Sequence, residues 1–288
     1  MKKNVTIAAL VYNPKSGSAL TKDQLVEVFE SHNISIGAFI AISDTLHEDL
    51  APYIKKNALI AAIGGDGTLS AVAGVLTGTE SIFVPLSGGT LNHFTKDLGI
   101  KQDLNEAVEA ILDAKPQTID VASINDTVFI NNSSLGLYPS SLQVRGRLED
   151  RLGKWPSAVI GVIRAFVQFR SYHLTINKTS FDTPFIFVGN NDYHLDTLEG
   201  SRTSLNEGLL SVYVISSNSR FALLKLLPYA LIGKLNDHDA FHTYHTTSFT
   251  ISSKRPAISI SHDGELSKFE TPLTYAIIKD GLRIIGNS

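Results

Sequence analysis

The sequence predicts an α/β domain with a parallel sheet over residues 1–118, followed by an antiparallel β domain over residues 119–288. Before Pro116, short apolar runs that are typical of buried parallel strands alternate with stretches whose apolar residues recur at helical spacing. After Pro116, strand-like runs follow one another mostly without helices between them, which is typical of an antiparallel sheet. The length of 288 residues is enough for two ordinary domains.

Composition restricts the possible functions. The hydrophobic content of 43% and charged content of 18% are those of a globular protein that can fill a core. The net charge of −3, without long runs of one sign, argues against nucleic acid as the main partner. Because the chain has no cysteine, disulfides and thiolate metal sites are excluded, and the composition suits a reducing cytoplasm.

The apolar run at residues 5–12 is short and is interrupted by Thr6, so we expect a first strand there rather than a signal peptide. No run of 18 or more apolar residues occurs, and no transmembrane helix is expected. In the first domain the pattern predicts further strands and intervening helices. The expected strands are 5–12, 34–42, 59–63 and 81–86, and the expected helices are 21–31, 47–56, 68–76 and 104–112.

The stretch Leu59–Ser70 carries the strongest functional signal. An apolar run leads into Gly64-Gly65-Asp66-Gly67, and Thr68 opens a helical pattern. Glycines let the backbone come close to a ligand, and a helix start offers unpaired N–H groups and a positive dipole end. A carboxylate there repels a phosphate unless a metal ion or sugar hydroxyl lies between them, so a nucleotide with its metal suits this turn. The alternative is a tight turn with Asp66 as helix N-cap.

Two further loops follow predicted parallel strands, and ligands of open α/β sheets lie at the carboxyl ends of strands. Residues 13–18 follow the first strand and combine a lysine, hydroxyls and a glycine, although a plain connecting loop has the same composition. Residues 87–90 form a second glycine turn, after which Thr90 and Asn92 are expected to face the same crevice as Asp66. His93 is more typical of a structural histidine than of a ligand.

Two turns of the β domain carry carboxylates. Glu207 lies in a turn that leads into a strand, where a carboxylate beside backbone carbonyls suits Mg²⁺ and where an exposed hairpin turn is the alternative. Asp263-Gly264 is a hairpin signal, and Glu265 beside it is a carboxylate at a fixed turn that can act as a general base. The expected strands of this domain are 119–124, 128–131, 172–177, 184–189, 209–215, 246–252, 257–262 and 273–278.

Two apolar helical stretches interrupt the β domain, at residues 154–169 and 220–235. The first begins beside Trp155, and the second is rich in leucine and is broken at Pro228. Such helices usually face a core. A leucine-rich helix with tryptophan, arginine and lysine at its margins also suits the surface of a bilayer.

Six segments stand in the order found in the diacylglycerol kinase catalytic-domain family, which the chain resembles over essentially its whole length. The Gly-Gly-Asp-Gly-Thr motif alone is shared with NAD kinases and loosely with phosphofructokinases, whereas the ordered set is more specific. The resemblance implies an NAD-kinase-like parallel α/β domain followed by an antiparallel β-sandwich. The six segments are Asn13-Pro14-Lys15-Ser16-Gly17, Gly64-Gly65-Asp66-Gly67-Thr68-Leu69, Gly89-Thr90-Leu91-Asn92-His93-Phe94, Asn131-Asn132-Ser133-Ser134-Leu135-Gly136, Asn206-Glu207-Gly208-Leu209 and Asp263-Gly264-Glu265.

The resemblance implies a lipid kinase that transfers the γ-phosphoryl group of ATP to a lipid hydroxyl with Mg²⁺. It implies that Glu265 accepts the proton and that Asp66 organises the metal–water shell. It also implies a Mg²⁺ site in the second domain formed by Ser204, Glu207 and Leu209. The implied ATP-binding residues are Asn13, Pro14, Lys15, Ser16, Gly17, Ser43 (with Thr45 as the alternative), Gly64, Gly65, Asp66, Gly67, Thr68, Leu69, Ser70 and Thr90.

The chain departs from the family pattern in two places, because Glu207 stands where aspartate is usual and Ser87-Gly88-Gly89 is longer than the shorter bacterial form. The acceptor lipid therefore does not carry over. The expected partner is a lipid at a membrane surface, with a cytoplasmic protein contacting the inner membrane face peripherally and a homodimer left open. The alternatives are an NAD-kinase-like kinase of a soluble acceptor and a catalytically silent lipid- or nucleotide-binding module.

Overall fold

The computed structural model describes residues 5–14, 20–136, 171–176, 179–194, 201–202, 204–216, 219, 221 and 238–286. The predictions for Lys15, Ser16 and Gly17 lie outside the described residues. So do the predicted helix at 154–169 and, apart from Phe221, the predicted helix at 220–235. Within the described part of the chain, none of the helices has the length and apolar character needed to cross a membrane.

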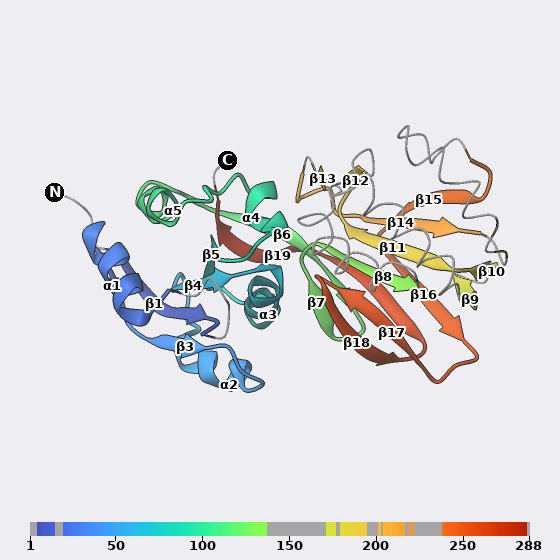
Figure 1. The fold of residues 1–288 in the computed structure, drawn as a ribbon, viewed down its shortest axis with the longest axis horizontal. Coiled ribbons are helices and arrows are strands. Elements are labelled where there is room, and N and C mark those ends of the chain that lie inside the picture. The colour runs from blue at the N-terminus through green and yellow to red at the C-terminus, as the bar shows by residue number, and fades with distance from the viewer. Residues whose placement is uncertain are drawn as a thin grey trace.

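The N-terminal half alternates strands and helices around a parallel sheet, as the sequence predicts (Figure 1). The strands β5, β4, β1 and β2 are neighbours in that order, and β3 extends the pairing of β2 along β1. The elements are β1 (Val5–Tyr12), α1 (Lys22–Ser31), β2 (Ile34–Ile36), β3 (Phe39–Ala41), α2 (Leu46–Leu50), the 3₁₀ turn η1 (Ala51–Tyr53), β4 (Leu59–Gly64), α3 (Asp66–Leu76), β5 (Ile82–Ser87), α4 (His93–Asp97) and α5 (Leu104–Ile111).

Local sequence explains the ends of these elements. Helix α1 begins with a capping box, in which Thr21 and Gln24 each accept a hydrogen bond from the other's backbone N–H. The strand expected at 34–42 is interrupted at Gly37, whose N–H donates to Ile7 O at 2.8 Å. A Cβ atom on Gly37 would lie 2.8 Å from Ala8 O, so only glycine allows this close approach of the two strands.

The C-terminal half consists mainly of antiparallel strands (Figure 1). The hairpin turn predicted at Asp263-Gly264 is confirmed, and a second tight hairpin turn lies at Asn125-Asp126. The strands are β6 (Pro116–Ile124), β7 (Thr127–Phe129), β8 (Asn132–Gly136), β9 (Tyr172–Ile176), β10 (Thr179–Thr183), β11 (Phe185–Asn190), β12 (Tyr193–His194), β13 (Ser201–Arg202), β14 (Leu210–Ile215), β15 (Phe241–Thr246), β16 (Ser248–Ser253), β17 (Ala257–His262), β18 (Glu265–Glu270) and β19 (Leu273–Ile285).

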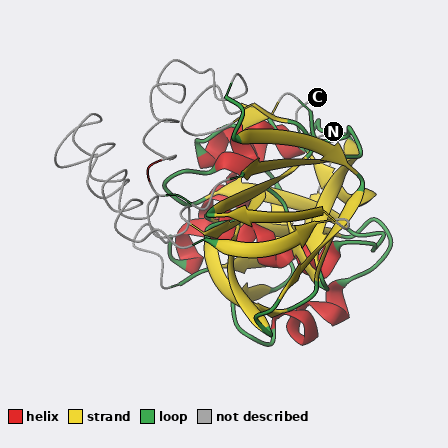
Figure 2. Cartoon of the chain, turned by 90° about the vertical axis from the view of Figure 1, so that its right-hand side faces the viewer, coloured by secondary structure: helices red, strands yellow, loops and turns green. Residues whose placement is uncertain are grey.

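Two sheets form the sandwich. One sheet has six strands in the order β15-β14-β11-β8-β17-β18. It faces strands β9, β16 and β19, which belong to the same sheet as the parallel strands of the N-terminal half. Leu135 and Val188 from the first sheet share one buried apolar cluster with Phe249 and Leu273 from the second. Figure 2 views the molecule from the end formed by these strands, and there the curved strands lie in front of the helices. The predicted α/β domain followed by an antiparallel β-sandwich is therefore confirmed.

The last strand joins the two halves. The first part of β19 pairs with β16, and its last part lies beside β5 in parallel, with Ile284 opposite Phe83. Strand β19 extends to Ile285 rather than ending at the predicted residue 278, through an irregular segment in which Asp280 has a φ of 51°. The predicted domain boundary between residues 118 and 119 falls within β6 and stays a prediction.

Candidate functional site

The two glycine turns lie against each other at the carboxyl ends of β4 and β5. The Gly88 N–H donates to Gly64 O at 2.9 Å. A Cβ atom on Gly88 would lie 2.8 Å from Gly64 N, and one on Gly89 would lie 2.5 Å from Gly65 Cα. Side chains at positions 88 and 89 are therefore excluded by the neighbouring backbone, and the glycines let the two turns meet.

A cavity of about 200 Å³ opens beside these turns, at the edge of the sheet where β1, β4 and β5 end. Its wall combines apolar side chains with amides and exposed backbone of the glycine turns. This mixture suits a ligand with an apolar ring and a polar group. The lining residues are Tyr12, Asn13, Leu20, Leu25, Ile63, Gly64, Ser87, Gly88, Gly89, Asn92, Gln102 and Leu104.

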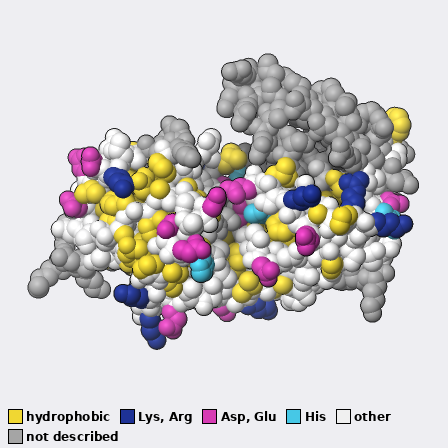
Figure 3. All heavy atoms as spheres, turned by 90° about the horizontal axis from the view of Figure 1, so that it is seen from below, with side chains coloured by type: hydrophobic (Ala, Val, Ile, Leu, Met, Phe, Trp, Pro, Cys, Tyr) yellow, Lys and Arg dark blue, Asp and Glu magenta, His cyan; other side chains and the backbone are white. Residues whose placement is uncertain are grey.

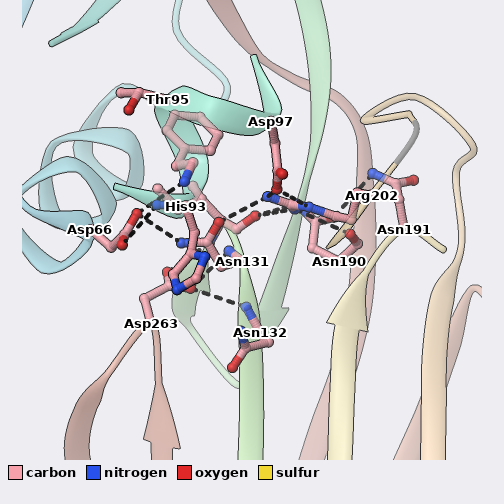
Figure 4. A network of polar contacts seen from close by, with 12 residues as sticks. Asp66, His93, Thr95, Asp97, Asn131, Asn132, Asn190, Asn191, Arg202 and Asp263 are labelled. Carbon is pink, nitrogen blue, oxygen red and sulfur yellow. Dashed lines mark hydrogen bonds and ion pairs between the residues drawn. The ribbon is translucent and has the colours of Figure 1, made fainter. Parts of the chain in front are cut away.

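Asp66 is the first residue of α3, but it does not cap its own helix. Gly65 is the N-cap residue of α3, and no side chain caps that end. The Asp66 carboxylate instead accepts hydrogen bonds from His93 N at 3.2 Å, Phe94 N at 3.0 Å and Asn131 Nδ2 at 3.3 Å (Figure 4). It therefore binds the start of α4 and the segment before β8, and the N-cap interpretation of Asp66 is wrong for α3.

A buried ion pair continues this network into the sandwich (Figure 4). Arg202 Nη2 donates to Asn131 Oδ1 at 2.8 Å, which orients the carboxamide so that its Nδ2 faces Asp66. The same guanidinium pairs with Asp97 of α4, with an Nη2–Oδ2 distance of 2.7 Å, and donates to two backbone carbonyls. Burial opposes the charge, but Tyr193 and Asp97 raise the pKa of Arg202 above its ordinary value, so it stays charged.

Asp263 lies at the centre of a second set of hydrogen bonds. Its buried carboxylate accepts from Ser70 Oγ at 2.5 Å and from the backbone N–H groups of residues 130, 131 and 132 at 2.7, 2.7 and 3.1 Å. Burial raises the pKa of the Asp263 carboxyl, and the hydrogen bonds that it accepts oppose this rise. Asp263 thereby fixes the β17–β18 hairpin to both α3 and the start of β8.

Glu265 follows that hairpin turn, in which Asp263 and Gly264 have φ angles of 45° and 86°. The exposed carboxylate lies across the first turn of α3, because a Cβ atom on Gly67 would be only 2.6 Å from Glu265 Oε1. The structure therefore brings Glu265 from the sandwich to the glycine turn of the α/β half. Glycine at position 67 leaves the space that this carboxylate occupies.

The other α3 residues predicted to bind nucleotide have side chains that serve the protein itself. Thr68 is buried against Gly64, Leu69 lies in the core, and Ser70 donates to Asp263. The side chains of these three residues therefore make their contacts within the protein.

The remaining predicted nucleotide residues lie around the same edge of the sheet. Pro14 and Thr90 are exposed, and Asn13 lines the cavity. Ser43 Oγ donates to Asp49 Oδ2 at 3.1 Å, and Thr45 Oγ1 donates to the same oxygen at 3.0 Å. Because both hydroxyls donate to the same oxygen, these contacts do not distinguish Ser43 from Thr45 as the predicted nucleotide-binding residue.

The predicted metal residues belong to the turn before β14. Ser204 Oγ accepts from a backbone N–H two residues on, Glu207 Oε2 accepts from Asp192 N at 2.8 Å, and Leu209 O accepts from Asn191 N at 3.0 Å. The described part of the chain holds no group of three or more His, Cys, Asp or Glu side chains able to bind a metal ion. These oxygens also serve the turn, and the Mg²⁺ site of Ser204, Glu207 and Leu209 stays a prediction.

The main residues that sequence reasoning missed are Asp263, Arg202 and Asp97. The sequence predicts only a turn at Asp263, because the partners of its carboxylate lie more than 130 positions away. Arg202 and Asp97 belong to none of the six motif segments. Local patterns therefore carried no signal for their pairing.

Comparisons with known proteins agree with this arrangement. Residues 7–124 match the diacylglycerol kinase catalytic domain, and residues 151–286 match the YegS C-terminal NAD kinase beta sandwich-like domain. The diacylglycerol kinase of Bacillus subtilis (strain 168) is 25% identical over 280 residues, which cover 90% of this chain and 89% of that protein.

Two solved structures show the fold. A diacylglycerol kinase from Bacillus anthracis str. Sterne superposes with a TM-score of 0.71 at 20% identity, covering 100% of this chain and 98% of that one. Yeast NADH kinase complexed with NADH superposes with a TM-score of 0.52 at 12% identity, covering 100% and 85%. Since the two domain matches follow each other over most of the sequence, the chain belongs to the diacylglycerol kinase catalytic-domain family, a family of lipid kinases.

Proposed function

We propose that this protein transfers the γ-phosphoryl group of ATP to the hydroxyl of a lipid alcohol, either diacylglycerol or a related lipid. The observation that carries the proposal is the position of Glu265, which the sandwich hairpin holds across the first turn of α3. A carboxylate there lies between the glycine turn and open solvent. Membership of the lipid kinase family supports the same activity.

ATP binds in the cavity between the glycine turns and α1 in this proposal. The apolar wall of Leu20, Leu25 and Leu104 suits the adenine ring, and the backbone of Gly64 and Gly89 suits the phosphates. Acidic side chains gather near the middle of the face in Figure 3. Asp66 and Glu265 lie at the first glycine turn, so a nucleotide without its metal would meet like charge there. The Mg²⁺ ion that accompanies ATP neutralises the phosphates and thereby removes this repulsion.

Glu265 acts as the general base. The acceptor oxygen forms a bond to the γ-phosphorus, the bond from that phosphorus to the β–γ bridging oxygen breaks, and the hydroxyl proton passes to the Glu265 carboxylate. Asp66 holds the start of α4 in place beside α3 through its bonds to His93 N and Phe94 N. Catalysis then consists largely of positioning and of neutralising charge.

ATP turnover separates this function from its alternatives. The assay measures ADP and phosphorylated product with no acceptor, with vesicles containing diacylglycerol or other lipid alcohols, and with NAD⁺ as a soluble acceptor. We expect turnover only with a lipid alcohol. Turnover with NAD⁺ alone would favour an NAD kinase, and ATP binding without turnover on any acceptor would favour a silent binding module.

Contact with a membrane follows from this function, because the acceptor is embedded in a bilayer. We propose a cytoplasmic protein that binds the inner membrane face peripherally. Flotation with anionic vesicles at low and high salt tests this, with association expected at low salt and weakening as salt rises. Absence of association at low salt would contradict it.

A further inference from the structure

A second cavity of about 200 Å³ runs along one face of α3. It lies between this helix, strand β7 and the β17–β18 hairpin, which are neighbours in Figure 1. None of its lining residues lines the nucleotide cavity. We call it the α3 groove; its lining residues are Gly67, Ser70, Ala71, Gly74, Thr127, Val128, His262, Asp263 and Glu265.

The α3 groove has a polar end and an apolar end. Helix positions 67, 70, 71 and 74 lie on one face of α3 and span two turns, a rise of about 10 Å. Glu265 lies at the Gly67 end, and Val128 lies at the Gly74 end, where a Cβ atom on Gly74 would be 3.8 Å from Val128 Cβ. A ligand that matches this groove carries a hydroxyl at one end and carbon at the other.

The volume limits how much of a lipid can enter. Pockets for drug-sized ligands measure about 300 to 1,000 Å³, and the α3 groove is smaller than this. A head group of about the size of glycerol fits with its first carbons, whereas long hydrocarbon chains do not. The small residues Ala71 and Gly74 keep this space open on the helix side.

His262 adds hydrogen-bonding capacity beside the base. His262 is opposite Glu265 in the backbone register of β17 and β18. Its Nε2 lies 3.2 Å from Ser267 Oγ. Its Nδ1 is buried without a hydrogen-bond partner among the residues that the structure describes. Since buried polar atoms are nearly always paired, this nitrogen is a candidate partner for a second oxygen of the head group.

We propose that the α3 groove binds the hydroxyl-bearing head of the acceptor lipid. The reacting hydroxyl lies at Glu265, the first apolar carbons lie between Gly74 and Val128, and the hydrocarbon chains remain outside the protein. The proposal rests on the lipid kinase function proposed above. In this proposal, the α3 groove selects acceptors by a compact alcohol head group rather than by the length of their hydrocarbon chains.

The experiment reduces the volume of the α3 groove by placing larger side chains on α3. Ala71 is exposed, so Ala71→Leu adds bulk without disturbing the core, and alanine and leucine have similar helix propensities. The probes are dioctanoylglycerol and a long-chain diacylglycerol in mixed micelles. We expect KM for both acceptors to rise at least about tenfold, equivalent to about 1.4 kcal/mol of binding, with KM for ATP unchanged.

Ala51→Leu is the matched control, because Ala51 is also exposed and does not line the groove. Gly74→Leu is a second variant at the apolar end, and thermal melts establish that each variant is folded. If the folded groove variants keep the wild-type acceptor KM, or if KM for ATP rises equally, the groove does not bind the acceptor head. If the wild-type protein phosphorylates none of the lipid alcohols, the proposed function is wrong, and so is the proposed role of the α3 groove.

Discussion

Replacing Arg202 with methionine should strongly destabilise the protein. The Arg202 side chain is fully buried, and its partner Asp97 is 16% exposed. The substitution keeps an apolar stem of similar length but leaves Asp97 and Asn131 Oδ1 without their donor and removes one donor from each of two backbone carbonyls. Breaking a buried ion pair by removing one partner typically costs about 3–5 kcal/mol, and we expect a loss of that size in the free energy of unfolding.

Urea denaturation followed by circular dichroism measures this loss, with Asp97→Asn and the double variant completing a thermodynamic cycle. The exposed pair of Lys101 and Glu106, with side chains 60% and 61% exposed, is the control, because such pairs contribute about 0–1 kcal/mol. We expect Lys101→Met to have a correspondingly small effect. If Arg202→Met costs no more than Lys101→Met and the cycle shows no coupling, the buried network does not hold the two halves together.

Three further substitutions test neighbouring contacts. Asp66→Ala should abolish turnover and lower the melting temperature, since the start of α4 loses its acceptor; wild-type-like turnover in folded protein would remove Asp66 from the mechanism. Ser70→Ala should cost about 1–3 kcal/mol by leaving the Asp263 carboxylate one donor short, and an unchanged urea midpoint would show that Asp263 does not need it. Glu207→Ala should loosen the turn that receives Asp192 N and raise the Mg²⁺ requirement of turnover; an unchanged Mg²⁺ titration would assign Glu207 to the turn alone.

Features with a local physical cause could be predicted from the sequence. The apolar run before Gly64 gave a buried strand, and helical spacing after it gave α3. Asp263-Gly264 formed the expected two-residue hairpin, since both residues tolerate positive φ. Because that hairpin has a fixed geometry, the sequence also placed Glu265 at a defined turn.

Features that depend on distant partners could not be predicted. The strand expected at 246–252 is largely β16, but β16 begins only at Ser248, because Thr246 ends β15 and the chain passes from one sheet to the other at Thr247. The continuation of β19 beside β5 depends on the order of strands in space, which hydrophobic periodicity does not encode. Likewise, the close contact of Gly88 and Gly89 with the neighbouring glycine turn depends on the placement of β4 beside β5.

The measurement that tests the central claim most directly compares ATP affinity with turnover in Glu265→Gln. A positioned base typically contributes about 10² to 10⁴-fold in rate, so we expect kcat on diacylglycerol vesicles to fall at least about a hundredfold. The Kd for ATP should stay at the wild-type value, because Glu265 does not line the nucleotide cavity. A parallel fall of ATP affinity and turnover would make Glu265 a structural residue, and wild-type turnover would place the base elsewhere.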